Sequence, residues 1–378
     1  MKFVLMMGLV SLFADVAYEG ARSANGSFLA VLGASGTAVG LVAGFGELVG
    51  YGFRLVSGIV SDRTKRYWAL TIFGYTVNLL AVPALALAGN WPTAAALMVL
   101  ERFGKSIRTP ARDVMISQAG SEIGRGWAFA VHEAMDQIGA MTGPLVVSAV
   151  LWVRGDYRAC YAALLLPAVL ALAVLFIART VFPHPHAMEK NREGGDGRGL
   201  TARFWWYLAA IGLVAAGTAD FPLIAFHFER TQSVPRLWVP VYYSGAMGVD
   251  ALAALVFGRW FDRRGVGVLM AVSLLSAFFA PLVFLGGPAV AAAGLALWAI
   301  GMGAQESVMR AALSDMLPSH KRGTAFGFWN IVYGLSWFAG SAVTGFLYDK
   351  SLPLVIIFSM ACILASIPVF WMLSRPAR

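Results

Sequence analysis

Charged side chains lie inside chain segments that are otherwise apolar enough to span a membrane. Residues 3–22 carry Asp15, Glu19 and Arg22 at positions i, i+4 and i+7, which share one helical face. Such charges cost roughly 2.5–3.5 kcal/mol each at the centre of a bilayer, so they usually face a partner or a water-filled path. A carboxyl group in a dry site is a candidate proton carrier. We therefore predict that Asp15 and Glu19 couple protons, as does Asp220 in the second half of the chain; pairing with a basic residue is the alternative.

A histidine and an acid follow at helical spacing in residues 126–152. His132 and Asp136 lie one helical turn apart, and a histidine titrates near neutral pH. The pair could pass a proton, so we predict both as proton-coupling residues. An ion pair with basic residues of the preceding segment is an equally open interpretation.

Basic residues are concentrated in residues 93–118. The segment contains six charged residues: Glu101, Arg102, Lys105, Arg108, Arg112 and Asp113. Several of them share one helical face, and a path lined by basic residues attracts carboxylates or phosphates. Residues 289–317 carry a second charged pair. The predicted substrate-binding residues are Glu101, Arg102, Glu306 and Arg310. In the alternative interpretation, Arg108 and Arg112 lie at the membrane surface and extend their charges into water.

The composition excludes an ordinary soluble protein. Hydrophobic residues make up 59% of the 378 residues and charged residues 13%, whereas soluble proteins have about 25% charged residues. Apolar runs of about 20 residues predict membrane-spanning helices, because lipid permits only helices or closed barrels. We predict an all-α integral membrane protein with twelve spans: 3–22, 36–60, 67–88, 93–118, 126–152, 158–180, 203–228, 237–260, 266–286, 289–317, 324–347 and 352–374.

The charge and the cysteines argue against several kinds of partner. The net charge of +9 fits an excess of basic residues in the loops on one side of the membrane, which places both termini in the cytoplasm and gives no reason to expect nucleic acid. The two cysteines, Cys160 and Cys362, lie in apolar surroundings and predict neither a disulfide framework nor a metal site. We expect no metal and no cofactor.

A short motif occurs twice, 200 residues apart. One copy contains Gly58, Asp62 and Arg63, and the other contains Gly258, Asp262 and Arg263. Each follows an apolar segment, which predicts two related halves that run parallel through the bilayer. We expect a bundle at 1–182, a cytoplasmic linker at 183–202 and a second bundle at 203–378. The motif residues could form a conformational latch, with Asp113 as the partner of the first arginine.

These motifs resemble those of the Major Facilitator Superfamily along essentially the whole chain. The two Gly-x-x-x-Asp-Arg motifs are similar to the family's cytoplasmic loop motif, and Arg102 resembles its intramembrane arginine. Gly139, Gly143 and Pro144 resemble the helix-packing motif of proton-coupled antiporters. The resemblance implies twelve helices in two pseudo-symmetric six-helix bundles that rock about a central site.

The function that we expect is secondary active transport by alternating access, with proton-coupled export of a small organic molecule. Uptake or exchange of an organic anion is the alternative, and a non-transporting sensor on the same scaffold is a third. The sequence lacks the phosphate-binding loop of an ATP-driven pump and the metal or nucleophile motifs of common enzymes, so we expect no enzyme. The expected partners are the substrate, protons and the lipid bilayer, and the expected form is a monomer in the inner (plasma) membrane.

Overall fold

The described chain consists of helices and short connections. The structure is a computed structural model that describes residues 1–120, 124–183, 202–315 and 322–375; within these ranges it leaves undescribed the side chains of 125–126, 306, 314–315 and 322–326. The helices in the first half are α1 (Lys2–Val31), α2 (Gly36–Thr64), α3 (Tyr67–Ala84), α4 (Trp91–Ala119), α5 (Arg125–Arg154), α6 (Tyr157–Ala163) and α7 (Leu165–Val181). Those in the second half are α8 (Ala202–Gly217), α9 (Phe221–Thr231), α10 (Trp238–Arg264), α11 (Val268–Ala277), α12 (Phe279–Leu285), α13 (Pro288–Glu306), α14 (Val308–Asp315), α15 (Arg322–Lys350) and α16 (Leu352–Ser374).

The prediction of an all-α membrane protein is confirmed. Ten described segments are long and apolar enough to cross a membrane. One of them, Trp238–Leu285, has 48 residues, which is enough for both spans predicted there. The charge-rich α4 is not among the ten, although it has 29 residues. These observations are consistent with twelve spans, four of which are built from two consecutive helices.

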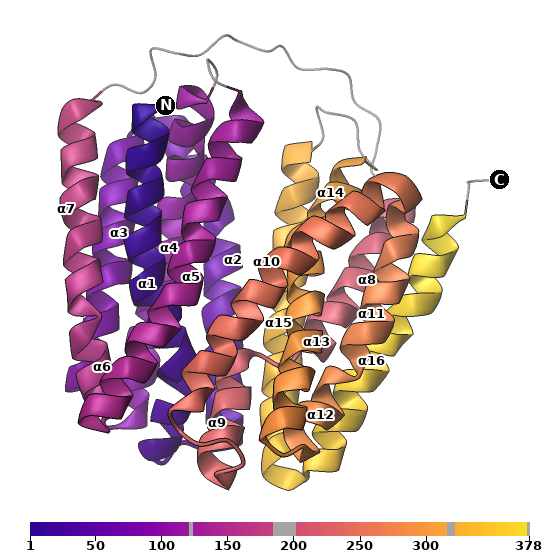
Figure 1. Cartoon of the computed structure of the whole chain (residues 1–378). Coiled ribbons are helices and arrows are strands. Elements are labelled where there is room, and N and C mark those ends of the chain that lie inside the picture. Colours follow the sequence, from indigo (N-terminus) through magenta and orange to yellow (C-terminus); the bar gives the residue numbers. More distant parts are fainter. Residues whose placement is uncertain (121–123, 184–201, 316–321, 376–378) are drawn as a thin grey trace. The chain divides into compact units, whose positions relative to one another are not determined.

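The described chain folds into two compact units. Figure 1 shows the chain with colours that follow the residue number. The first unit comprises Met1–Gly33, Val49–Arg192 and Leu237–Ser244, and the second comprises Ala34–Leu48, Glu193–Arg236 and Gly245–Arg378. Residues 34–48, which were predicted in the first half, belong to the second unit, and residues 237–244, which were predicted in the second half, belong to the first unit. Most of the predicted linker at 183–202 lies outside the described residues.

Glycines set the helix spacing in the first unit. A Cβ atom added at Gly139 would lie 2.5 Å from the carbonyl oxygen of Leu12, and one at Gly143 would lie 2.4 Å from that of Val16. Any larger residue would force α5 away from α1. Gly74 and Gly104 have the same role between α3 and α4, since a Cβ at Gly104 would lie 2.4 Å from the backbone nitrogen of Asn78. The glycines of the predicted packing motif are thus in the α1–α5 contact, as expected for close helix packing in membranes.

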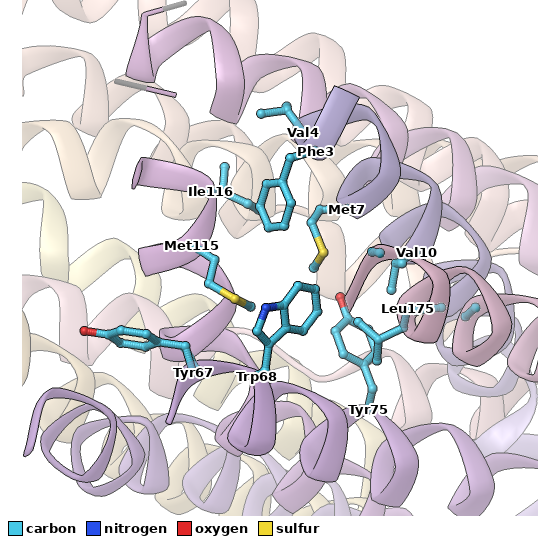
Figure 2. Packing of buried hydrophobic residues seen from close by; sticks show 14 of the residues in the cluster. Phe3, Val4, Met7, Val10, Tyr67, Trp68, Tyr75, Met115, Ile116 and Leu175 are labelled. Carbon is cyan, nitrogen blue, oxygen red and sulfur yellow. The ribbon is translucent and has the colours of Figure 1, made fainter. Parts of the chain in front are cut away.

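An apolar cluster occupies one part of the first unit (Figure 2). Its buried side chains come from α1, α3, α4, α5 and α7, and Figure 2 shows Phe3, Met7 and Trp68 among them. The indole of Trp68 donates a hydrogen bond to the carbonyl oxygen of Phe182 at 3.0 Å. Tyr75 is fully buried in the same cluster, but its hydroxyl lies 3.4 Å from Ser11 Oγ. The cluster therefore borders the polar side chains of α1.

The repeated motif has the same local structure in both copies. Residues 57–64 and 257–264 show an identical sequence of buried, half-buried and exposed side chains. Both helices then end in the left-handed backbone region, with φ of 55° at Lys65 and 60° at Gly265. The motif lies in the last turns of α2 and α10 and not in a loop, because both helices continue four residues beyond their predicted ends. The backbone agreement supports the internal repeat.

In the second unit, one acid joins two helices that are far apart in the sequence. Asp349 near the end of α15 accepts hydrogen bonds from the backbone nitrogens of Gly36 at 2.8 Å and Thr37 at 2.7 Å, and from the Thr37 hydroxyl at 2.6 Å. The first backbone N–H groups of a helix have no partner within the helix, so a carboxylate there stabilises the helix end. Asp349 thereby fixes the beginning of α2 to α15.

The C-terminal end of α10 suggests a matched pair of substitutions, one inside the helix and one directly after it. A Cβ would meet no atom within 4 Å at either Gly258 or Gly265, so only backbone effects should differ. We expect Gly265→Ala to lower the free energy of unfolding by about 1 kcal/mol, because its φ disfavours a side chain. Gly258→Ala lies inside the helix and should raise it by roughly 0.5–1 kcal/mol. Denaturant unfolding in detergent measures both, and equal shifts would contradict the left-handed turn at Gly265.

The α1–α5 contact can be tested in the same way. Gly143→Ala should lower the free energy of unfolding by about 1–3 kcal/mol, because the added methyl group has no space beside Val16. Gly50→Ala is the control, since a Cβ there would meet no atom within 4 Å. If Gly143→Ala changes the free energy of unfolding as Gly50→Ala does, the two helices are not in close contact at Gly143.

Candidate functional site

A polar junction centred on Ser11 joins four helices inside the first unit. Ser11 Oγ lies 2.9 Å from His132 Nε2 on α5 and 3.4 Å from the hydroxyl of Tyr75 on α3. The guanidinium of Arg112 on α4 donates a hydrogen bond to the same oxygen at 3.3 Å. His132 Nδ1 in turn lies 3.5 Å from Asp136 Oδ2. The predicted pair of His132 and Asp136 thus belongs to a connected chain of polar groups.

Helix packing explains why these groups meet. The glycines of α5 bring its backbone against α1, which carries Ser11 and Asp15. A Cβ at Gly139 would lie 3.0 Å from Asp15 Cβ, so this acid is at the α1–α5 contact. His132 lies seven residues before Gly139 and therefore on the same face of α5.

Asp15 lies among basic residues of α4. The charges of Lys105, Arg108 and Arg112 all act on its carboxyl group, as does that of Glu19 one turn away. Asp15 also acts on Asp136, so the acids of α1 and α5 belong to one electrostatic group. The structure thus brings together three of the predicted proton-coupling residues: Asp15, His132 and Asp136.

The remaining charged candidates of the first unit form a second cluster. Glu19 is buried and accepts a hydrogen bond from the hydroxyl of Tyr243 at 2.6 Å. Glu101 is buried as well and accepts one from the side-chain amide of Asn78 at 2.6 Å. Arg102 Nε lies 3.6 Å from Glu101 Oε2. All three predicted residues are therefore held by specific partners.

A tyrosine connects this second cluster to Asp15. The ring of Tyr18, which is almost fully buried, lies 3.6 Å from Lys105 Nζ and 5.0 Å from the Arg102 guanidinium. Cations are attracted to aromatic ring faces, and more strongly when they are removed from water. Tyr18 thus holds two positive charges of α4 next to the acids of α1.

Arg108 is the most buried cation of α4. It is only 1% exposed, which contradicts the alternative that it extends into water at the membrane surface. Its guanidinium carbon lies 4.1 Å from the centre of the Tyr75 ring. Neither Nε nor Nη1 has a hydrogen-bond acceptor among the described residues. Buried N–H groups of a cation without an acceptor are costly, so this position requires an explanation.

In the second unit, Asp220 occupies a break between two helices. Its Oδ1 accepts a hydrogen bond from the backbone nitrogen of Phe221 at 2.9 Å, which caps the start of α9. Its Oδ2 lies 3.4 Å from Trp337 Nε1. The indole of Trp298 donates to the carbonyl oxygen of Ala219 at 2.9 Å. These contacts give Asp220 a structural role, and its role in proton coupling stays a prediction.

Other predicted residues lie apart from these clusters. The side chain of Glu306 lies outside the described part of the structure, and Arg310 is exposed, with its guanidinium 5.6 Å from the Trp329 ring centre. Asp62, Arg63, Asp262 and Arg263 are exposed at the helix ends. Asp113 pairs with Arg112 at 2.8 Å and, among the described side chains, not with Arg63. The latch therefore stays a prediction.

Several residues of the network were not predicted as site residues. These residues are uncharged, and the sequence does not distinguish them from other residues of membrane helices: Ser11, Tyr18, Tyr75, Asn78 and Tyr243. Arg108 was distinguishable, because it shares a helical face with Glu101 and Lys105. The described residues contain no group of three or more His, Cys, Asp or Glu side chains arranged to hold a metal ion.

Comparison with known proteins gives the family. The sequence profile of the Major Facilitator Superfamily matches residues 7–341 and 222–378. An uncharacterized protein of Mycobacterium tuberculosis is 38% identical over 382 residues, which cover 99% of this chain and 93% of the relative. A protein of Methanocaldococcus jannaschii named as an uncharacterized MFS-type transporter is 29% identical over 143 residues, covering 38% of this chain and 35% of the relative.

Solved structures agree on the fold. A bacterial homologue of the human lysosomal transporter Spinster superposes with a TM-score of 0.76 at 13% identity, covering 99% of this chain and 96% of that one. A nucleoside transporter superposes with a TM-score of 0.75 at 14% identity, covering 98% of each chain. Members of this family and fold are typically non-enzymatic. On this evidence the chain belongs to the Major Facilitator Superfamily and is a multi-pass membrane transporter.

Proposed function

We propose that the protein is a proton-coupled secondary transporter of a small organic molecule that works by alternating access. The polar junction between α1, α3, α4 and α5 carries this proposal. Its His132 is buried in the interior of the first unit, where unpaired polar groups are costly, and the neighbouring Asp15 and Asp136 are half-buried. Buried titratable groups that contact one another in a membrane protein commonly mark a proton path.

The geometry suits proton transfer in small steps. Asp136 lies 3.5 Å from one nitrogen of His132, and the other nitrogen lies 2.9 Å from Ser11. A neutral imidazole has one donor and one acceptor nitrogen, so His132 can accept a proton at one nitrogen and release a proton from the other. Asp15 and Asp136 repel each other as long as both are charged. A proton bound to either acid reduces this repulsion.

The repeated motif supports alternating access. Within each unit, packing does not require its glycines: a Cβ at Gly58 would meet only Pro110 Cβ at 3.9 Å, and one at Gly258 would meet nothing within 4 Å. The exposed Asp-Arg pairs lie at equivalent helix ends in both copies. We propose that these residues act as a latch in one of the transport conformations.

The direction of transport is a separate question. Export was expected from the resemblance of Gly139, Gly143 and Pro144 to an antiporter motif. Close packing of α5 on α1 accounts for both glycines, so they carry little weight for direction. Export stays a prediction, and uptake or exchange of an organic anion is favoured by one specific observation, the buried Arg108. We also propose the inner (plasma) membrane with both termini in the cytoplasm, which rests on the charge distribution of the loops.

Proton coupling can be measured in proteoliposomes that contain an internal pH indicator. We expect at least one compound from cationic, zwitterionic and anionic panels to cause proton movement with the unmodified protein. Asp15→Asn and Asp136→Asn should each abolish this movement, because an amide cannot carry the proton. Asp156→Asn is the control: Asp156 is an exposed acid that caps α6 outside the network, and asparagine caps a helix equally well.

Two results would contradict the proposal. Undiminished proton movement in both network variants would show that the junction is not the proton path. A compound that crosses the membrane without any proton movement in the unmodified protein would exclude coupling. Binding and folding of the variants are checked by thermal unfolding with the same compound.

A further inference from the structure

The guanidinium of Arg108 is a buried positive charge, and two of its three nitrogen atoms lack an acceptor in the described chain. Its Nε and Nη1 atoms have no hydrogen-bond acceptor among the described residues, although the side chain is only 1% exposed. The charged group lies over the Tyr75 ring, with its guanidinium carbon 4.1 Å from the ring centre. A ring face attracts a cation but accepts none of the five N–H bonds in their plane.

Two neighbouring cations of α4, Arg102 and Arg112, differ from Arg108 because they have anionic partners. Arg112 pairs with Asp113 at 2.8 Å and donates to Ser11. Arg102 lies 3.6 Å from a carboxylate oxygen of Glu101. Lys105 resembles Arg108, since its ammonium lies over the ring of Tyr18 and has no ion pair among the described side chains. Two cations one helical turn apart thus lack an anionic partner in direct contact.

Two acids, Asp15 and Glu101, lie close enough to influence both cations. The charges of Lys105 and Arg108 act on Asp15, although neither cation forms a direct ion pair with it in the described structure. Asp15 therefore balances part of their charge from a distance. A negatively charged group placed between the cations would compete with Asp15 for them.

We infer that Lys105 and Arg108 bind the anionic group, a carboxylate or phosphate, of the transported molecule. The planar guanidinium can bind two oxygens of such a group, and the ammonium adds a point charge one turn away. This inference rests on the proposed transport function and names the substrate class for the same unit. The inference also gives Asp15 two roles. The charged carboxylate of Asp15 weakens binding of the anion, and protonation of Asp15 strengthens it.

The test uses the full-length protein, purified in neutral detergent, with succinate, benzoate and inorganic phosphate as anionic probes. Succinamide and tetraphenylphosphonium are the neutral and cationic probes. A ligand that binds only the folded state raises its melting temperature. We expect at least one anion to do so, and we expect its apparent affinity to fall about 10- to 100-fold in Arg108→Gln and Lys105→Gln, the range for a hydrogen bond to a charged group.

Two further variants distinguish this role from a structural one. Asp15→Asn should bind the anion more tightly than the unmodified protein, because the competing charge is removed. Arg154→Gln removes an exposed arginine at the end of α5 and should leave anion binding unchanged. If Arg108→Gln fails to fold, the other two variants still test the inference. We expect Lys105→Gln to weaken anion binding and Asp15→Asn to strengthen it.

An anionic lipid headgroup offers the same chemistry as a free anion. The measurement is therefore repeated in nanodiscs of phosphatidylcholine alone and in nanodiscs that also contain phosphatidylglycerol. A free substrate stabilises the protein in phosphatidylcholine, whereas a lipid site gives stabilisation by phosphatidylglycerol that Arg108→Gln removes and succinate does not displace. The second result would overturn the inference.

The remaining outcomes separate this inference from the proposed function. Stabilisation by tetraphenylphosphonium but by no anion would overturn the inferred substrate class. If that cation also causes proton movement, the proposal of proton-coupled transport still holds. Equal anion binding by Arg108→Gln and the unmodified protein would also overturn the inference. Anion binding that depends on Arg108, without proton movement, would instead contradict the proposed coupling.

Discussion

The close approach of α1 and α5 is the constraint on which the first unit depends. Gly139 and Gly143 allow the backbones of the two helices to touch, and side chains at these positions would occupy the space of α1 carbonyl groups. In lipid, helices associate through such packing and not through the hydrophobic effect. The contact places Ser11 and Asp15 beside His132 and Asp136, and α3 and α4 complete the junction through Tyr75 and Arg112. Small residues on two helices thereby determine where the buried charges meet.

Both units bury acids: Glu19 and Glu101 in the first, and Glu47, Asp220, Glu229 and Asp250 in the second. The first unit also groups four cations of α4 near the acids; Arg102 and Arg112 have carboxylate partners, whereas Lys105 and Arg108 lie over tyrosine rings. In the second unit, the described positions equivalent to His132 and Asp136 are Trp329 and Tyr333, whose rings stack 4.8 Å apart, and the Tyr333 hydroxyl binds Gln305. Asp220 there caps a helix. The cations of α4 that act on Asp15 therefore distinguish the first unit.

Much of the fold follows from the sequence because hydrophobic length and charged loop motifs report directly on membrane helices. The repeat at Gly58 and Gly258 correctly indicated equivalent helix ends, although charged residues continue both helices to 64 and 264. Breaks within spans were missed, since the stop between α8 and α9 depends on a cap and on tertiary hydrogen bonds. The charged residues of the site were visible, but their partners were not: Tyr18, Asn78 and Tyr243 gain significance only from contacts with distant helices. In the described structure Asp113 pairs with the adjacent Arg112, and its predicted pairing with Arg63 stays a prediction.

The central claim is that the carboxyl groups of the α1–α5 junction exchange protons. Infrared difference spectroscopy on the protein in nanodiscs measures this directly, because a protonated carboxyl group has a carbonyl stretch that a carboxylate lacks. We expect a carboxyl band that changes with pH in the unmodified protein and is lost in Asp136→Asn, with a shifted band in Asp15→Asn because the two acids interact. Identical pH-dependent spectra for the unmodified protein and both variants would show that these acids do not titrate, and would contradict the account.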